Sequence, residues 1–512
     1  MAAAGGFLAA ALLHPSAATG ATCDSLSSLT LPDAHITSAA LVGAGAFTLP
    51  ETGRGNGRGN ANPFANTPAF CRVAATLTPS SDSDIKIEVW LPDPSRWNGK
   101  FQAVGNGGWA GSISYPALAA AVAGGYATVS TDTGHVGNTA AFGLGHPEKL
   151  TDIAYRAVHE MTVKGKALVN AYYGDAPKLS FWNGCSLGGR QGISAAQRYP
   201  ADFDAIVAGA PAVNAMDLHV GRTAMNLAAH KTPESTIPPT KYPMIHEAVL
   251  QACDGLDGVK DGVLENPMAC HFDPKVLQCK GDDAPSCLTA AQVDSAKAMY
   301  AAVKNPKTGA IIVPGLEPGS ELSWATLGGP LPNVNALEAE KYIIHKDANW
   351  DLKSFDLAKE LELESKVDPA LSSSSTNLKP FFDRGGKLLI YHGFSDPQVP
   401  DQNTINYFTK VVNGSGKGLA GKQIQLYMVP GMNHCQGGPG TDTFDKMGAI
   451  ESWVATGKAP DRIVASHLTA GKVDRTRPLC PFGKVAKWSG TGSTDEAANF
   501  SCVADSATGS TK

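Results

Sequence analysis

The feature that most constrains the fold of this chain is an alternation of short apolar strands and helices in its first half. A long helix is predicted at residues 152–173, where Ala, Val and Met recur at helical spacing, and a second is predicted to end near Tyr199. The segments typical of strands are residues 85–91, 100–104, 126–131, 178–183 and 205–208. This alternation predicts an α/β fold with a mostly parallel sheet covered by helices.

The alternation stops after Pro211 and returns much later in the chain. A strand is predicted at residues 386–391, a helix near 402–412 and a strand at 423–429. Between them lie frequent Pro and Gly, four cysteines and a helix that begins with the capping box Thr289-Ala-Ala-Gln292. We therefore expect one sheet domain formed by residues 23–213 and 378–512, and an inserted lid domain at 214–377.

The N-terminus and the cysteines both bear on the compartment. Residues 7–13 are apolar and small residues follow, so residues 1–22 are predicted to be a signal peptide remnant, although the usual basic start is absent. The chain has ten cysteines and no C-x-x-C pair, which favours disulfides over a metal site. We expect a secreted or periplasmic protein. Sequence alone does not determine the pairing, although Cys253/Cys270, Cys279/Cys287 and Cys480/Cys502 are natural local partners.

Composition argues against two classes of partner. The net charge is −5 with a pI near 6.2, and no Lys/Arg cluster could follow a phosphate backbone, so nucleic acid is not expected. The apolar run near the N-terminus is too short to span a membrane, and no other segment is a candidate.

The stretch Gly184-Cys-Ser-Leu-Gly188 matches G-x-S-x-G and lies between a predicted strand and a predicted helix. In such a nucleophile elbow the sharp turn presents only the central side chain, here Ser186. We therefore predict that Ser186 is the nucleophile. The alternatives are a structural turn serine and Cys185 acting as the nucleophile.

An acid and a base follow the last two predicted strands. Asp396 follows the strand at 386–391 and His434 follows the strand at 423–429, which is the chain order Ser, Asp, His of an α/β-hydrolase. Asp401 is the competing acid, but we expect it to start the next helix. His135 and His392 are competing histidines, but neither follows the final strand.

These positions predict an acyl-transfer mechanism. His434 would take the proton of Ser186 and Asp396 would orient the imidazole. An oxyanion hole needs two N–H donors, and we expect one from Leu187 and the other from the glycine-rich turn that contains Gly107 and Gly108.

Cys185 precedes Ser186 and Cys435 follows His434, so a formed triad would bring these cysteines close enough to consider a disulfide. The segments GCSLGGR, HGFSDPQVP and GMNHC resemble the tannase and feruloyl esterase family, from about Cys23 to Cys502. That family includes bacterial esterases of mono(2-hydroxyethyl) terephthalate. The resemblance implies an α/β-hydrolase core sheet with a large inserted lid domain, and a disulfide beside the triad. It also implies the pairs Cys23–Cys71, Cys253–Cys270, Cys279–Cys287 and Cys480–Cys502.

The lid contains Asp254, Asp257 and Asp261 on a glycine-rich segment. Such carboxylates suit calcium, although the spacing is not that of an EF-hand and solvated Asx turns are the alternative. The resemblance implies a structural Ca²⁺ held by these three side chains and by the main-chain carbonyls of Val259 and Val263.

The function we expect is a serine esterase acting on esters of aromatic, hydroxycinnamic acids, either small molecules or linked to polysaccharide. Gallate esters and terephthalate monoesters are the alternative substrates. An inactive binding protein and a serine peptidase are the alternative classes. Trp324 and Trp350 are candidates for either the pocket wall or the lid core.

Overall fold

A nine-stranded sheet forms the centre of the computed structural model, which describes residues 20–50, 62–414 and 418–505. The strand order is β1-β2-β3-β6-β4-β8-β9-β12-β13, and the six strands from β6 to β13 are parallel. The bounds are β1 (Ala34–Val42), β2 (Phe70–Leu77), β3 (Ile85–Pro92), β4 (Lys100–Val104), β6 (Ala127–Thr131), β8 (Leu179–Cys185), β9 (Ala205–Gly209), β12 (Lys387–Gly393) and β13 (Ile424–Val429).

The sequence-based prediction of a parallel sheet is confirmed for these six strands, but the N-terminal edge differs. β1, β2 and β3 pair antiparallel with one another, and β3 is antiparallel to β6. Only a short turn joins β2 to β3, and a parallel neighbour would have required a crossover helix. Strands β1 and β2 were not predicted.

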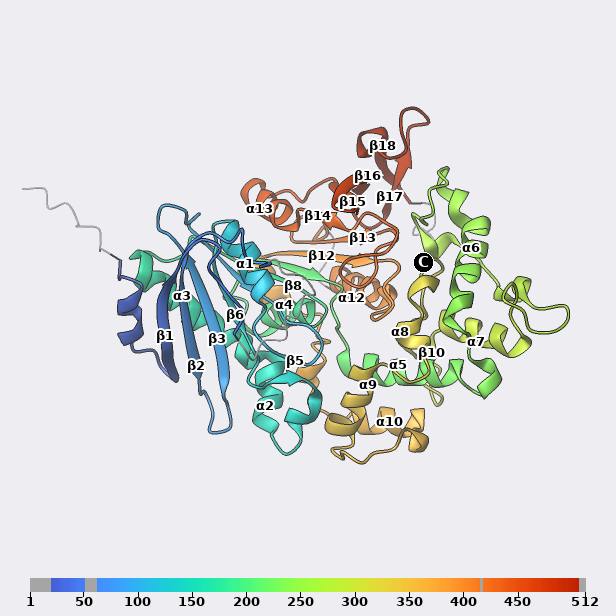
Figure 1. Cartoon of the computed structure of the whole chain (residues 1–512), viewed down its shortest axis with the longest axis horizontal. Helices are drawn as coiled ribbons and strands as arrows, with labels where there is room; N and C mark the ends of the chain where they lie inside the picture. The colour runs from blue at the N-terminus through green and yellow to red at the C-terminus, as the bar shows by residue number, and fades with distance from the viewer. Residues whose placement is uncertain (1–19, 51–61, 415–417, 506–512) are drawn as a thin grey trace, which may run out of the picture.

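Helices cover both faces of the sheet (Figure 1). On one face α3 (Ala157–Tyr173), α4 (Leu187–Arg198) and α12 (Asp401–Gly414) contribute Met161, Ile193 and Phe408 to a large apolar core. On the other, α1 (Tyr115–Ala123) and α13 (Lys446–Thr456) contribute Leu118 and Trp453 to a second core. The sheet is therefore buried on both sides, as parallel sheets require.

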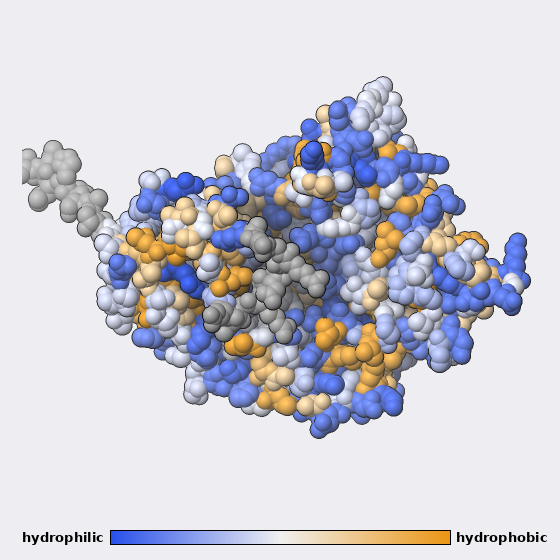
Figure 2. Space-filling view, in the orientation of Figure 1, coloured by the Kyte–Doolittle hydropathy of each residue, from blue (hydrophilic) through white to orange (hydrophobic). Residues whose placement is uncertain are grey.

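The chain leaves the sheet after β9 and returns to it at β12. The intervening segment has its own apolar core, in which Trp324 packs near Tyr242 and Tyr300. Hydrophilic residues cover much of its outer surface, and hydrophobic residues gather over the region of α5 and α9 (Figure 2). Its helices are α5 (Ala215–Ala229), α6 (Tyr242–Cys253), α7 (Ala290–Tyr300), α8 (Ala325–Gly328), α9 (Val334–Glu338), the π-helical turn η10 (Ala339–Ile344) and α10 (Leu357–Glu364). The capping box at Thr289 is confirmed at the start of α7.

After β13 the chain forms two small antiparallel sheets that were not predicted. One contains β14 (Thr443–Phe444), β15 (Ile463–Thr469) and β16 (Lys472–Leu479), and the other contains β17 (Lys484–Trp488) and β18 (Phe500–Ala504). In Figure 1 these red strands lie beside the green lid.

All five disulfides implied by the resemblance form in the structure. They are Cys23–Cys71, Cys185–Cys435, Cys253–Cys270, Cys279–Cys287 and Cys480–Cys502. Most of the predicted signal peptide remnant, residues 1–19, lies outside the described residues. Among the described residues, no helix is long and apolar enough to cross a membrane.

Candidate active site

Ser186 lies in the turn that joins β8 to α4, as the motif predicted. Its φ of 64° and ψ of −121° are a strained combination for a residue with a Cβ. The flanking glycines permit the turn: a Cβ on Gly184 would lie 2.6 Å from the carbonyl oxygen of Gly188, and one on Gly188 would lie 3.1 Å from that of Asn106. The turn therefore places its strained residue, Ser186, in the wall of the cavity described below.

Asp396 and His434 meet at the carboxyl ends of β12 and β13. The Nδ1 of His434 donates a hydrogen bond of 2.6 Å to the Oδ2 of Asp396. The other carboxylate oxygen, Oδ1, accepts the backbone N–H groups of Gln398 at 2.7 Å and Val399 at 2.9 Å. This fixes the carboxylate, and leaves the Nε2 of His434 available on the opposite edge of the imidazole ring. Asp401 instead begins α12 and is buried away from His434.

A second histidine supports the same carboxylate. The Nε2 of His392 lies 3.0 Å from the Oδ2 of Asp396, and its Nδ1 lies 2.8 Å from the hydroxyl of Thr404. His392 is fully buried. The sequence suggested it only as a competing base. The sequence predicts that His392 lies at the end of β12. It does not predict the contact with Asp396, because that contact depends on how the loop after β12 folds back.

These contacts determine the protonation state of Asp396. Burial acts to raise the pKa of this carboxyl group. The opposing charge of His434 and hydrogen bonds from His392 and His434 are stronger together, so the pKa lies well below its ordinary range. Asp396 is therefore ionised and can hold His434 in the tautomer that carries hydrogen on Nδ1.

Ser186 and His434 line one cavity of about 380 Å³. Leu187, Gly107 and Gly108 line it too, and among the described hydrogen bonds none uses their backbone N–H groups. The structure thus brings the predicted oxyanion-hole residues to the nucleophile. Their free donors can receive a negatively charged oxygen beside Ser186.

Hydrogen bonds between Asn106 and Gln191 hold the glycine-rich turn against α4, the helix that follows Ser186. Asn106 accepts a hydrogen bond from the Gln191 amide at 3.1 Å, and its backbone N–H donates to the Gln191 side-chain oxygen at 3.0 Å. The Asn106 amide also donates to the carbonyl of Thr131 at 2.7 Å. Both residues were missed, because reciprocal contacts between segments 85 positions apart leave no local pattern.

Two buried arginines add positive charge to the cavity. Arg190 donates to the carbonyl of Leu371 at 2.9 Å, and Arg222 donates to the carbonyl of Gln398 at 2.6 Å. Within the described residues neither forms an ion pair with a carboxylate. Burial lowers the pKa of each to about 10, so both stay charged at neutral pH. Their remaining donors make this cavity suited to anionic groups.

The disulfide Cys185–Cys435 joins the neighbours of Ser186 and His434. Its S–S distance is 2.06 Å and the two Cα atoms are 6.1 Å apart. Because Cys185 is bonded, it carries no free thiol. The structure therefore argues against Cys185 as the nucleophile.

Trp109 lines the cavity, and its ring centroid lies 5.3 Å from that of His219, which lines the cavity too. Trp324 belongs to the lid core, and Trp350 stacks on His345 at 5.0 Å. Neither lines the described cavity. The pocket-wall alternative is thus not supported for either residue.

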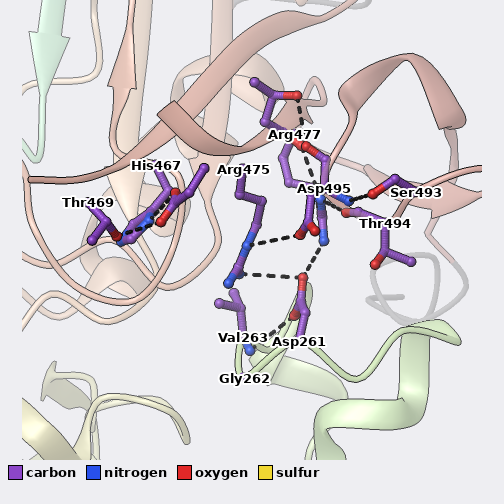
Figure 3. Close-up of polar contacts among 12 residues, drawn as sticks. Asp261, Gly262, Val263, His467, Thr469, Arg475, Arg477, Ser493, Thr494 and Asp495 are labelled. Atoms are coloured by element: carbon purple, nitrogen blue, oxygen red, sulfur yellow. Dashed lines mark hydrogen bonds and ion pairs between the residues drawn. The ribbon is translucent and has the colours of Figure 1, made fainter. Parts of the chain in front are cut away.

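The aspartate-rich loop of the lid meets the C-terminal strands. Asp261 forms ion pairs with Arg477 and, at 3.6 Å, with Arg475, both on β16 (Figure 3). A small cavity of about 20 Å³ is lined by Asp257, Asp261 and Val263 and also by Arg475 and Arg477, whereas Asp254 and Val259 do not line it. Such a volume suits a single water-sized species.

The three carboxylates of this loop are electrostatically coupled. Burial, together with the charges of Asp261 and Asp254, raises the pKa of Asp257 to about 6. Asp254 accepts the N–H of Gly262 at 3.2 Å, on the inner side of the loop. Val259 also lies in this segment and is buried. This donor set fits a hard divalent cation.

A family model described as tannase and feruloyl esterase matches residues 71–503. The chain belongs to the tannase and feruloyl esterase family. It is 36% identical to an uncharacterised esterase of Xanthomonas campestris pv. campestris, over 96% of this chain and 92% of that protein. It is 32% identical to a probable feruloyl esterase B-1 of Aspergillus oryzae, over 96% and 94% of the two chains.

Solved structures of this family agree with the fold. Feruloyl esterase B from Aspergillus oryzae superposes with a TM-score of 0.86 at 31% identity, covering 94% of this chain and 99% of that one. A tannin acyl hydrolase from Aspergillus niger has a TM-score of 0.75 at 22% identity, covering 93% of each chain, and supports the fold alone. The expected α/β-hydrolase core is thereby confirmed.

Proposed function

We propose that this chain, a carboxylic ester hydrolase by family, cleaves esters of aromatic hydroxycinnamic acids through an acyl-enzyme on Ser186. One observation carries the assignment of roles: His434, which is hydrogen-bonded to the buried Asp396, lines the same cavity as the strained Ser186. The 32% identity to a probable feruloyl esterase supports the feruloyl class over gallate esters.

The proposed reaction has two halves. The Oγ of Ser186 attacks the ester carbonyl carbon while the Nε2 of His434 takes its proton, and the oxyanion forms beside the N–H groups of Leu187 and Gly108. Collapse breaks the ester C–O bond, and His434 returns the proton to the leaving alcohol. Water then attacks the acyl carbon while His434 takes its proton. Collapse breaks the bond to the Oγ of Ser186, which receives that proton, and the acid is released.

The lid and the compartment belong to the same proposal. Five disulfides fit an oxidising environment, so we propose that the protein is secreted or periplasmic. We also propose that Asp254, Asp257 and Asp261, with the carbonyls of Val259 and Val263, would hold a structural Ca²⁺. That ion would supply charge neutralisation in the lid and takes no part in the reaction.

One experiment tests the nucleophile. Ser186→Ala, with Cys185 retained, should abolish labelling by a fluorophosphonate and lower esterase kcat by several orders of magnitude. Substantial remaining turnover would reject Ser186. An unlabelled, inactive wild-type protein would instead indicate a binding protein that has lost the activity.

A second experiment tests the substrate class. We expect kcat/KM to be higher for methyl ferulate than for methyl gallate, with chlorogenate and mono(2-hydroxyethyl) terephthalate as comparison substrates. A preference for methyl gallate would instead indicate a tannase, which acts on gallate esters. Cleavage of p-nitroanilides as fast as p-nitrophenyl esters would favour a peptidase.

A further inference from the structure

Three ligand-type side chains meet inside the lid, apart from the aspartate loop. Glu340 and His345 lie at the π-helical turn η10, and Glu360 lies on α10. One ligand atom from each lies within 4.8 Å of the other two. Among the described residues this is the one such group of three His, Cys, Asp or Glu side chains.

The π turn is what brings Glu340 and His345 together. In an α-helix, residues five apart point in directions that differ by about 140°, because each residue turns the chain by about 100°. Here the N–H of His345 donates to the carbonyl of Glu340 at 2.9 Å, which is the i→i+5 bond of a π turn. One full turn therefore separates the two residues, and both side chains point toward α10.

The acidic side chains are buried without sufficient partners. Glu340 and Glu360 are both 0% exposed. Both carboxylate oxygens of Glu340 and the Oε1 of Glu360 have no hydrogen-bond partner in the described structure. Leaving such groups unsatisfied is destabilising, and more so when they are charged.

His345 satisfies only one of these oxygens. Its Nε2 lies 2.6 Å from the Oε2 of Glu360, and the ring stacks against Trp350 at 5.0 Å. Two carboxylates and one protonated imidazole would still leave a net negative charge. Protonating Glu340 would remove that charge, but its new O–H donor would lack an acceptor in the described structure.

A divalent cation would both neutralise the buried negative charge and provide a partner for the unpaired carboxylate oxygens. Two carboxylates and a neutral imidazole carry a charge of −2, which one divalent ion neutralises, and the unpartnered oxygens become ligands. One nitrogen and two carboxylate donors suit first-row transition metals better than Ca²⁺, which takes oxygen ligands. The ion would bind the Nε2 of His345, so the neutral imidazole would carry its proton on Nδ1.

We propose that Glu340, His345 and Glu360 form a structural binding site for a divalent transition metal, with Zn²⁺ as the best fit. The site would fasten α10 to η10. Both elements pack against α5, which contributes Met216, His219 and Arg222 to the wall of the active-site cavity. The ion would therefore stabilise the lid wall without touching the reacting atoms.

The test uses the purified full-length chain, treated with 1,10-phenanthroline to remove transition metals while Ca²⁺ is kept in excess. Adding Zn²⁺ should restore one equivalent of bound metal by mass spectrometry and raise Tm by on the order of 5 °C. Co²⁺ in its place should give a visible d–d absorption band. These readouts are independent of esterase activity.

Matched variants decide the ligands. Glu340→Gln should lose the bound equivalent and the Zn²⁺-dependent rise in Tm, whereas Glu362→Gln, on the exposed face of the same α10, should keep both. If Glu340 is simply a buried acid, Glu340→Gln will match or exceed wild-type Tm and wild type will bind no stoichiometric metal. Either result overturns the proposal. His345→Ala provides an independent second variant with the same expected loss.

Discussion

At the scale of single residues, the site depends on the ionised state of Asp396 and on the strained backbone conformation of Ser186. Asp396 is ionised because its two histidine partners outweigh the effect of burial on its pKa. Ser186 retains a positive φ because Gly184 and Gly188 leave room for the turn. Both conditions serve the proposed transfer of one proton from Ser186 to His434.

Asp396→Asn should therefore reduce kcat by about 10³–10⁴-fold, because an amide can stabilise the wrong histidine tautomer and carries no charge for the imidazolium. Steady-state kinetics on methyl ferulate would measure this loss. Asp401→Asn is the matched control, since Asp401 begins α12 and does not contact His434, and should change kcat little. Equal losses in the two variants would reject Asp396 as the orienting acid.

The two buried arginines predict a preference for anionic substrates. A carboxylate that reaches Arg190 or Arg222 should gain charge-assisted hydrogen bonds, so ethyl 4-carboxybenzoate should exceed ethyl 4-carbamoylbenzoate in kcat/KM by roughly 10-fold. Arg222→Gln should reduce this ratio even if it slows both substrates. A ratio near one in the wild type would show that neither guanidinium contacts the substrate.

The sequence predicted the residues whose positions follow from local motifs. Ser186 follows from G-x-S-x-G, and Asp396 and His434 follow from the ends of the last two strands. His392, Asn106 and Gln191 could not be predicted in the same way, because their roles come from contacts between distant loops. Arg190 and Arg222 are likewise evident only once their helices lie against one cavity.

At the scale of elements, Cys185–Cys435 joins the end of β8 to the loop after β13. Replacing both cysteines by alanine should cost roughly 5 kcal/mol of unfolding free energy, against roughly 2 kcal/mol for Cys279 and Cys287, because the bridged loops differ greatly in length. Their sequence separations are 250 and 8 residues.

Activity should separate these two disulfide variants more sharply than stability does. Loss of Cys185–Cys435 frees the nucleophile from its base and should lower kcat about 100-fold at a temperature where the variant is still folded. Loss of Cys279–Cys287 should leave kcat unchanged. Unchanged kcat in the first variant would limit that disulfide to a stabilising role.

Glu317 of the lid and Asp401 at the start of α12 predict how stability depends on pH. Burial raises the pKa of Glu317 to about 7, and that of Asp401 is raised as well, first by burial and then by the charge of Glu317. Between pH ~4.3 and 7 the unfolded chain releases the Glu317 proton while the folded chain retains it. The free energy of unfolding should therefore fall as pH rises through this window.

Glu317→Gln should remove this dependence. The free energy of unfolding of the variant, relative to wild type, should therefore be about 3 kcal/mol higher at pH 8 than at pH 4. Urea unfolding at the two pH values, with metal ions held constant, measures the difference. Parallel pH profiles for the two proteins would show that Glu317 ionises normally in the folded state.

The elements themselves were predicted unevenly, for a physical reason. β4 has the predicted bounds, and β8, β9, β12 and β13 differ by one or two residues at their ends, because buried parallel strands are continuous apolar runs. The edge strand β1, its neighbour β2 and the strands after β13 have mixed exposure. Their weaker pattern resembles that of loops.

At the scale of the whole molecule, contacts far apart in sequence join the lid to the rest of the chain, and two of them lie close to the proposed sites. Near the cavity, the Oγ of Ser395 donates to the carbonyl of Gly319 at 3.1 Å. At the outer end, Asp261 meets Arg475 and Arg477 of β16, so the aspartate loop lies between the lid and the C-terminal strands (Figure 3). An ion in this loop would stabilise the contact between these two parts of the molecule.

Removing Ca²⁺ should therefore lower Tm by several degrees without changing kcat at a temperature where the protein remains folded. EGTA also binds Zn²⁺, so a Zn²⁺ buffer that holds the free Zn²⁺ concentration constant is needed to isolate this site from the Glu340 cluster. Asp257→Asn should have the Tm of the EGTA-treated wild type and lose its response to Ca²⁺, whereas Asp282→Asn, at an exposed lid position, should respond normally. Loss of activity in a protein that stays folded after chelation would contradict a purely structural ion. A Tm that changes with neither EGTA nor Ca²⁺ would show that Arg475 and Arg477 alone neutralise the loop.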